Sequence, residues 1–278
     1  MAKITKAIIL TAGYGTRRLP ITKALEKCML PIGNRPLIDY IVEDCIIAGI
    51  TDIMFVVGEQ SDQIRTYYGT NQLLEDYLRR LGKASQLEQV TSIARKASFH
   101  YVVQSSSMPY GTAVPVDLCS FWVGADDQVL VAAGDNFLYR TDGKSDLARL
   151  LTAVELDGAT AGLLASKLPR EQLIGGVIEL GADNRHFKDI LETSDPEAAT
   201  SNLFNASKYL FDRAMFDYAH KVMLNPPAEN GEYQVTEALK AYVRDEGKQL
   251  VVEYAEGIYL DGGSTAGWLH ANNVVLNV

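Results

Sequence analysis

The sequence runs from Ala7-Ile8-Ile9-Leu10-Thr11 through Ala12 into Gly13-Tyr14-Gly15-Thr16-Arg17. The first five residues are apolar or β-branched, which predicts a buried strand. The glycines that follow let backbone N–H groups approach a ligand, because no Cβ stands in the way. Arg17 and Lys27 place two positive charges along the same loop. Backbone donors and two cations after a first strand predict a binding site for a nucleoside triphosphate.

The spacing of the glycines excludes two common phosphate-binding motifs. A Walker P-loop requires G-x-x-x-x-G-K-[ST], and the chain contains no such run. A dinucleotide-binding fingerprint needs a third glycine three residues after the second, where this chain has Arg18. Taken alone, the Gly-x-Gly pair is equally compatible with a tight turn after a strand.

Strand-like and helix-like patterns alternate along the first half of the chain. Apolar strand patterns cover 7–11, 53–57, 99–103 and 128–133, and helical spacing covers 35–47 and 63–68. This alternation predicts an α/β fold with a mostly parallel sheet and helices on both faces. Residues 71–96 are polar and prone to form helix, so we expect them to be an insertion outside the core.

The second half has shorter strand patterns. A core strand is predicted at 159–165, followed by strand-like segments at 176–180 and 186–192 and helices near 212–223 and 234–246. The short segments predict a small antiparallel lobe packed beside the main sheet. No low-complexity linker divides the chain, so we expect residues 1–278 to form a single domain.

Composition limits the classes of function. The net charge is −9, which argues against nucleic-acid binding driven by overall charge. Three cysteines without a C-x-x-C pair suggest neither a disulfide framework nor a zinc site. No apolar run has transmembrane length, and residues 1–5 lack the apolar core of a signal peptide. We therefore expect a cytoplasmic protein without membrane or nucleic-acid partners.

A longer motif is more specific than the glycine pair. The chain reads G-x-G-T-R-x-x-P-x-T-K over 13–23, and then Lys27-Cys28-Met29-Leu30-Pro31. This combination resembles the sugar-nucleotide pyrophosphorylases, and most closely their branch of bacterial UTP–glucose-1-phosphate uridylyltransferases. The resemblance implies a Rossmann-like, mostly parallel mixed sheet with a small antiparallel sugar-binding lobe. It also implies transfer from UTP to glucose 1-phosphate, a magnesium (Mg2+) cofactor, and a homodimer or homotetramer.

The resemblance assigns the first group of site residues. Arg17 and Lys27 would neutralise the phosphates during nucleotidyl transfer, and Ala12, Gly13, Gly15 and Thr16 would bind the nucleotide. Asp135, in Gly134-Asp135-Asn136, follows a predicted strand, where an exposed carboxylate could bind Mg2+ or simply form a turn or helix cap. Asp261, in Leu260-Asp261-Gly262-Gly263-Ser264, matches the second metal-binding aspartate of the family.

Gln104 and Gly111 are candidates for binding the base. Gln104 follows a predicted strand, and a side-chain amide donates and accepts at once, so it can read the imide edge of a pyrimidine. Without the resemblance, a polar loop residue is an equally good interpretation of Gln104. The family places a glycine-rich loop after this glutamine, and Gly111 fits that loop.

The sugar end differs from the family pattern. Gly176 and Glu192 match residues that hold the sugar, but Thr193 stands where the family has a lysine that binds the sugar phosphate. Thr193 can donate one hydrogen bond but brings no charge. Upstream, Glu26 could pair with the adjacent Lys27 and weaken its attraction for phosphate. Cys28 is interpreted as a small buried hydrophobe rather than a reactive thiol.

These departures leave alternatives open. The chain could be an enzyme with another nucleotide or sugar specificity, such as dTTP. It could also be a weakly active or inactive protein that binds a nucleotide sugar.

Overall fold

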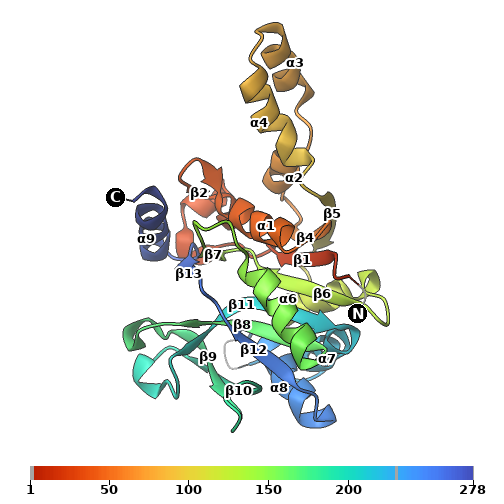
Figure 1. Ribbon diagram of the computed structural model, residues 1–278, viewed down its shortest axis with the longest axis vertical. Coiled ribbons are helices and arrows are strands. Elements are labelled where there is room, and N and C mark those ends of the chain that lie inside the picture. The colour runs from red at the N-terminus through yellow and green to blue at the C-terminus, as the bar shows by residue number, and fades with distance from the viewer. Residues whose placement is uncertain (1–2, 229–230, 278) are drawn as a thin grey trace.

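Within residues 3–228 and 231–277, which the computed structural model describes, nine strands form one mixed sheet (Figure 1). Four neighbouring strands are parallel, in the order β6-β1-β4-β5. They are β1 (Lys6–Leu10), β4 (Asp52–Gly58), β5 (Ser98–Gln104) and β6 (Gln128–Ala133). The predicted parallel α/β core is therefore confirmed.

Side chains of the parallel strands alternate between two hydrophobic cores. In β1, Ala7 and Ile9 pack into one cluster, whereas Ile8 packs into the other. Successive side chains of a strand point to opposite faces of its sheet, so a continuous apolar run signals burial on both sides. The strand before the glycine loop is thus held from both faces, which fixes the point where the loop begins.

Helices cover both faces, as expected. On one face lie α1 (Leu37–Ile47) and α6 (Asp146–Asp157), and on the other lie α5 (Ala113–Leu118), α7 (Arg213–Met223) and α8 (Val235–Glu246). Pro36, which the sequence pattern places inside the first of these helices, is instead its N-cap, with extended backbone.

The antiparallel part of the fold continues the same sheet. Strand β11 (Leu203–Asp212) runs antiparallel to β6 and connects the parallel strands to the rest. The remaining strands are β8 (Ala161–Lys167), β9 (Gly175–Leu180), β10 (Phe187–Thr193) and β12 (Leu250–Tyr254). Because β9 pairs with β11 at one residue pair, the predicted lobe of β9 and β10 is an extension of the main sheet.

The predicted insertion forms a helical arm that projects from the body (Figure 1). It consists of α3 (Gln72–Arg80) and α4 (Ala84–Ala94) and follows the short helix α2 (Gln63–Tyr68). No residue of α4 is buried. The arm therefore adds no layer to the core, as the polar sequence predicts.

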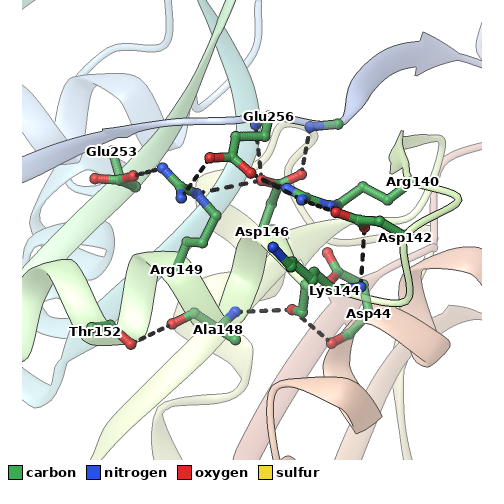
Figure 2. Close-up of polar contacts among 12 residues, drawn as sticks. Asp44, Arg140, Asp142, Lys144, Asp146, Ala148, Arg149, Thr152, Glu253 and Glu256 are labelled. Carbon is green, nitrogen blue, oxygen red and sulfur yellow. Dashed lines mark hydrogen bonds and ion pairs between the residues drawn. The ribbon is translucent and has the colours of Figure 1, made fainter.

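A network of charged groups fixes the segment that follows β12 and leads to the last elements of the chain (Figure 2). The buried Asp146 carboxylate accepts hydrogen bonds from the backbone N–H groups of Glu256 and Gly257, both at 2.9 Å, and from Arg140 at 3.0 Å. The next element, β13 (Ile258–Asp261), pairs antiparallel with β7 (Asn136–Tyr139). Asp146 thereby anchors the segment that carries Asp261 to the sheet.

The remaining described elements are short or terminal. They are the hairpin strands β2 (Pro31–Ile32) and β3 (Arg35–Pro36), and the helix α9 (Thr265–Leu276). Short 3-10 turns occupy Thr16–Arg18, Ile21–Lys23 and Lys27–Met29 in the opening loop, and Ser120–Trp122, Arg170–Gln172 and Pro196–Ala198 elsewhere. Across the described part of the chain, no helix has both the length and the apolar character needed to cross a membrane.

Candidate active site

The carboxyl ends of the parallel strands open into one pocket. Its wall includes the last residues of β1, β4, β5 and β6. Ligands of open α/β sheets bind at this edge. Six of the residues selected from the sequence line the pocket: Ala12, Gly13, Lys27, Gln104, Gly111 and Asp135. They come from four segments that are far apart in the sequence.

Lys27 and Asp135 form an ion pair inside this pocket. The Lys27 Nζ lies 2.7 Å from Asp135 Oδ2, and less than a fifth of either side chain is exposed. Burial alone would lower the pKa of Lys27, but the Asp135 carboxylate outweighs it and raises the pKa above its ordinary value. Burial likewise tends to raise the pKa of Asp135, whereas the charges of Lys27, Lys208 and Arg17 bring it below the ordinary value. Both groups are therefore charged near neutral pH.

The glycine loop is shaped around Lys27. A Cβ added at Gly13 would lie 3.2 Å from Lys27 Nζ, a tight contact with the ammonium that glycine avoids. Gly15 has φ of +64°, and the Thr22 hydroxyl donates to its carbonyl at 2.9 Å. Thr16 begins the next 3-10 turn and lines a neighbouring cavity that Lys27 also borders.

Asp261 and Arg17 meet Asp135 around Gly263. A Cβ at Gly263 would lie 2.9 Å from Arg17 Nη2, 3.0 Å from Asp261 Oδ1 and 3.5 Å from Asp135 Oδ2. The pairing of β13 with β7 places Asp261 opposite Asn136, and Gly262 N donates to Asp135 O at 2.8 Å. Arg17 is exposed and does not line the Lys27 pocket, but its guanidinium is near enough for its charge to lower the pKa of Asp135.

The Asp261 carboxylate also orders its own turn. Its two oxygens accept hydrogen bonds from the N–H groups of Gly263 and Ser264 and from the Ser264 hydroxyl, at 2.9 to 3.2 Å. These bonds hold Asp261 in a fixed orientation beside Asp135. A turn role and a ligand role are thus compatible in the same side chain.

The two carboxylates suit a magnesium ion. Mg2+ prefers carboxylate oxygens and is usually held by one or two of them, together with substrate phosphates and water. Among the described residues, no cluster of three or more His, Cys, Asp and Glu side chains is arranged to hold a metal. The pair of Asp135 and Asp261 fits a cation that is shared with a phosphate ligand rather than held by protein alone.

The expectation that Glu26 pairs with Lys27 is wrong. The Glu26 carboxylate accepts hydrogen bonds from Gln63 N at 2.9 Å and from the Ser61 hydroxyl, at the start of α2. A carboxylate is favoured at this position, because the first N–H groups of a helix have no partner within it. Lys27 is free of Glu26 and turns toward Asp135. Cys28 is fully buried, and burial raises the pKa of its thiol, as expected for a small hydrophobe.

We expect Glu26→Ala to lower stability without changing turnover. The substitution removes two hydrogen bonds that join the opening loop to α2, which costs about 1 to 2 kcal/mol. Thermal unfolding should shift down by a few degrees, while nucleotidyl transfer, the activity that the family resemblance implies, stays within about twofold of the unmodified protein. A clear gain of activity would show that Glu26 does weaken Lys27.

A backbone clamp fixes the loop after Gln104. Tyr233 N donates to Tyr110 O at 2.9 Å, and Ala113 N donates to Tyr233 O at 2.8 Å. Gly111, with φ of +127°, lies between these bonds, and a Cβ there would be 2.3 Å from Tyr233 N and O. Glycine is thus required at 111 so that the segment before α8 can close one side of the pocket.

The predicted sugar residues lie where the start of β9 pairs with the end of β10. Gly176 pairs with Glu192, and a Cβ at Gly176 would be 3.2 Å from Glu192 Oε1. Desolvation raises the pKa of Glu192, and Thr236 and Lys240 partly offset that rise. Thr193 is occupied in a local turn, since its hydroxyl exchanges hydrogen bonds with the backbone of Asp195, both at 3.0 Å. None of these residues borders the Lys27 pocket.

Two cations at the site were not selected as site residues. Arg18 is buried, donates to Ser264 O at 2.8 Å and lies over the Trp268 ring, so it fixes the turn that follows Asp261. Lys208 is fully buried beside the Asp135 turn. A lysine inside the apolar strand of residues 203–212 is the signal that could have identified it. Lys188, a further lysine near the sugar end, is exposed and pairs with Glu179 on β9.

Comparison with known proteins agrees with this geometry. The sequence model of the family described as "Nucleotidyl transferase" matches residues 6–277. A putative UTP–glucose-1-phosphate uridylyltransferase of Methanocaldococcus jannaschii is 33% identical over 97% of this chain and 92% of the relative. The UTP–glucose-1-phosphate uridylyltransferase YngB of Bacillus subtilis is 30% identical over 98% and 90%.

Solved structures show the same relationship. A UDP-glucose pyrophosphorylase complexed with UDP-glucose superimposes with a TM-score of 0.83 at 27% identity, over 99% of both chains. The UTP-bound UGPase from Acinetobacter baumannii gives a TM-score of 0.84 at 26% identity, over 98% of this chain and 93% of the other. The resemblance predicted from the opening motif is confirmed over nearly the whole length. This chain belongs to the nucleotidyl transferase family.

Proposed function

We propose that the protein transfers a uridylyl group from UTP to glucose 1-phosphate, giving UDP-glucose and pyrophosphate. The observation that carries this proposal is the Lys27–Asp135 ion pair in a pocket also lined by Gly13, Gln104 and Gly111. Support comes from relatives named for this reaction and from neighbours solved with UTP or UDP-glucose.

In the proposed reaction, a phosphate oxygen of glucose 1-phosphate attacks the α-phosphorus of UTP. The bond from that phosphorus to the bridging oxygen breaks in line, and pyrophosphate leaves with the electron pair. No covalent intermediate with the protein is needed, so catalysis consists of positioning and charge stabilisation. Lys27 and Arg17 would neutralise the phosphates, while Ala12, Gly13, Gly15 and Thr16 bring backbone groups close to them.

The nucleotide and the metal would occupy adjacent parts of the site. Gln104 would read the uracil edge, and Gly111 would let the clamped loop lie against the base. Asp135 and Asp261 would hold Mg2+, which supplies positive charge to the α-phosphate and the sugar phosphate when bound. Gly176 and Glu192 would contact the sugar, with Glu192 accepting from its hydroxyls.

We expect Thr193→Lys to improve the use of glucose 1-phosphate. A hydrogen bond from a charged donor contributes about 1.5 to 3 kcal/mol to binding, so KM for the sugar phosphate should fall by about tenfold or more. The KM for UTP should stay unchanged, because Thr193 lies outside the Lys27 pocket. Steady-state kinetics with each substrate varied separately check this. An unchanged KM for the sugar phosphate would mean that the phosphate does not bind near residue 193.

A matrix of substrates tests the proposed function. Purified protein with Mg2+ is given UTP, dTTP, ATP, GTP or CTP, each with a panel of sugar 1-phosphates, and pyrophosphate release is measured. UTP with glucose 1-phosphate should give the highest kcat/KM. Preference for another pair would indicate a different specificity. If calorimetry shows tight binding of UDP-glucose but no substrate pair is turned over, the chain would instead be a protein that binds a nucleotide sugar. The threonine at position 193, where the family has a lysine, is compatible with that alternative.

The remaining proposals concern the protein as a whole. We propose that residues 1–278 form one nucleotidyltransferase domain. The proposal is supported by the nine-stranded sheet, which runs through both halves of the described chain; residues 1–2, 229–230 and 278 lie outside the described residues. We also propose a cytoplasmic homodimer or homotetramer, which size-exclusion chromatography with light scattering would test.

A further inference from the structure

Lys208 is a fully buried cation whose partners are carbonyl groups. Only 1% of its surface is exposed, although it lies in the middle of β11. Its ammonium donates to Asn136 O at 3.1 Å, to Ala133 O at 3.3 Å and to Ala206 O at 3.4 Å, and it also bonds the Asn136 side-chain oxygen. Removing a charge from water is costly, so a cation is retained in such a place only where its contacts compensate.

The carbonyl groups that bind Lys208 include residues on both sides of Asp135 in the sequence. Ala133 is the last residue of β6 and Asn136 is the first residue of β7, so one ammonium holds both sides of the two-residue turn that carries Asp135. Inside the turn, Gly134 N donates to Leu10 O at 3.0 Å, which ties the turn to β1. The turn is therefore fixed from β11 on one side and from β1 on the other.

We propose that Lys208 is a positioning residue for the reaction: by clamping the backbone on both sides of Asp135, it holds that carboxylate in the geometry that binds the metal and faces Lys27. This inference rests on the proposed function, in which Asp135 is a metal ligand. Groups that orient a metal ligand typically change metal affinity or activity by about 10- to 100-fold when they are removed.

The direction in which metal affinity changes when Lys208 is replaced distinguishes the clamp from a purely electrostatic effect of its charge. The positive charge of Lys208 lies near the metal site and repels a cation. Losing that charge alone would strengthen metal binding. Losing the clamp would weaken metal binding, because the Asp135 carboxylate would sample several orientations. The clamp predicts a weaker metal site in Lys208→Met, and the charge alone predicts a stronger one.

The experiment compares Lys208→Met with Lys6→Met. Lys6 is the control for loss of a lysine from the sheet, because its ammonium also bonds a backbone carbonyl, Trp122 O at 3.2 Å. Unlike Lys208, it pairs with an aspartate, Asp127 at 2.6 Å, and it lies at the opposite end of the strands. Two quantities are measured near pH 7: the Mg2+ concentration for half-maximal pyrophosphate release, and the affinity of the UTP complex for Mn2+ by EPR. Thermal unfolding reports stability separately.

Lys208→Met should weaken Mn2+ binding and raise the Mg2+ requirement by about 10-fold or more, whereas Lys6→Met should leave both within about twofold. Lys208→Arg, which keeps charge and donors, should recover part of the loss. If Lys208→Met does not fold, Asn136→Ala removes only the side-chain acceptor and should shift both quantities in the same direction. Unchanged or stronger metal binding in a folded variant overturns the inference. Absence of any turnover in the unmodified protein would instead refute the proposed function.

Discussion

Lys27→Met should reduce pyrophosphate release by about 10³-fold. Methionine keeps the length of the side chain but removes the ammonium that faces the pocket and pairs with Asp135. Losing one preorganised group that stabilises developing charge costs about 10² to 10³ in kcat, and cations that stabilise phosphoryl transfer contribute 10³ or more. Single-turnover measurements at saturating UTP would assign the loss to the chemical step.

The matched control for this prediction is Lys6→Met. Lys6 forms an ion pair of similar length with Asp127, at the far end of the strands from the pocket. Its loss should cost some stability and leave kcat within about threefold. Equal losses in the two variants would mean that Lys27 acts through folding. A Lys27→Met protein with nearly full activity would remove the proposed catalytic role of the pair.

Asp135→Asn should also lower turnover by about 10³-fold, and in addition raise the Mg2+ concentration needed for activity. The amide is nearly isosteric but carries no charge, so it is a poor ligand for a hard cation. The same change leaves the mostly buried Lys27 ammonium without its carboxylate, and it removes one negative charge from the surroundings of Lys208 and Arg17. We therefore expect reduced thermal stability as well, because buried cations lose their compensating charge.

The comparison for Asp135→Asn is Asp127→Asn, which breaks the Lys6 pair. Activity titrated with Mg2+ distinguishes the two variants. Asp127→Asn should keep the Mg2+ requirement of the unmodified protein. Asp135→Asn at high Mg2+ could turn out to be as active as the unmodified protein at low Mg2+. In that case Asp135 would bind the metal without contributing to the chemical step. An unchanged Mg2+ requirement in Asp135→Asn would show that the metal binds elsewhere.

Local sequence patterns were sufficient to predict one side of the site. The apolar run at 7–11 must be a buried strand, and the residues that follow such strands gather at one edge of a parallel sheet. Gln104 and Asp135 follow strands of the same kind, so their meeting in one pocket could be expected. The polar, helix-prone composition of residues 71–96 also identified the arm of α3 and α4 as peripheral. These features depend on periodicity, which a single sequence displays.

Features that depend on long-range pairing could not be predicted in this way. Asp261 lies beside Asp135 because β13 pairs with β7, two short strands with no strong pattern of their own. Only the family resemblance pointed to it. The helix α5 has six residues and contains Pro115, which usually signals the end of a helix. The network around Asp146 joins segments more than a hundred residues apart.

The error at Glu26 has a specific physical reason. Glu26 and Lys27 are adjacent in the sequence, but neighbours in the sequence need not contact one another in the fold. In the structure Glu26 precedes the Lys27–Met29 turn and points to the start of α2, while Lys27 points into the pocket. The partners of the Glu26 carboxylate lie 35 and 37 residues away and could be identified only from the fold.

The most direct test of nucleotidyl transfer follows the phosphorus atoms themselves. Purified protein, UTP, glucose 1-phosphate and Mg2+ are observed by 31P NMR, with Lys27→Met in parallel. We predict that the unmodified protein converts the UTP and sugar phosphate signals into those of UDP-glucose and pyrophosphate in equal amounts, and that Lys27→Met gives about 10³-fold slower conversion. Unchanged substrate signals with the unmodified protein, or hydrolysis of UTP without UDP-glucose, would contradict the account.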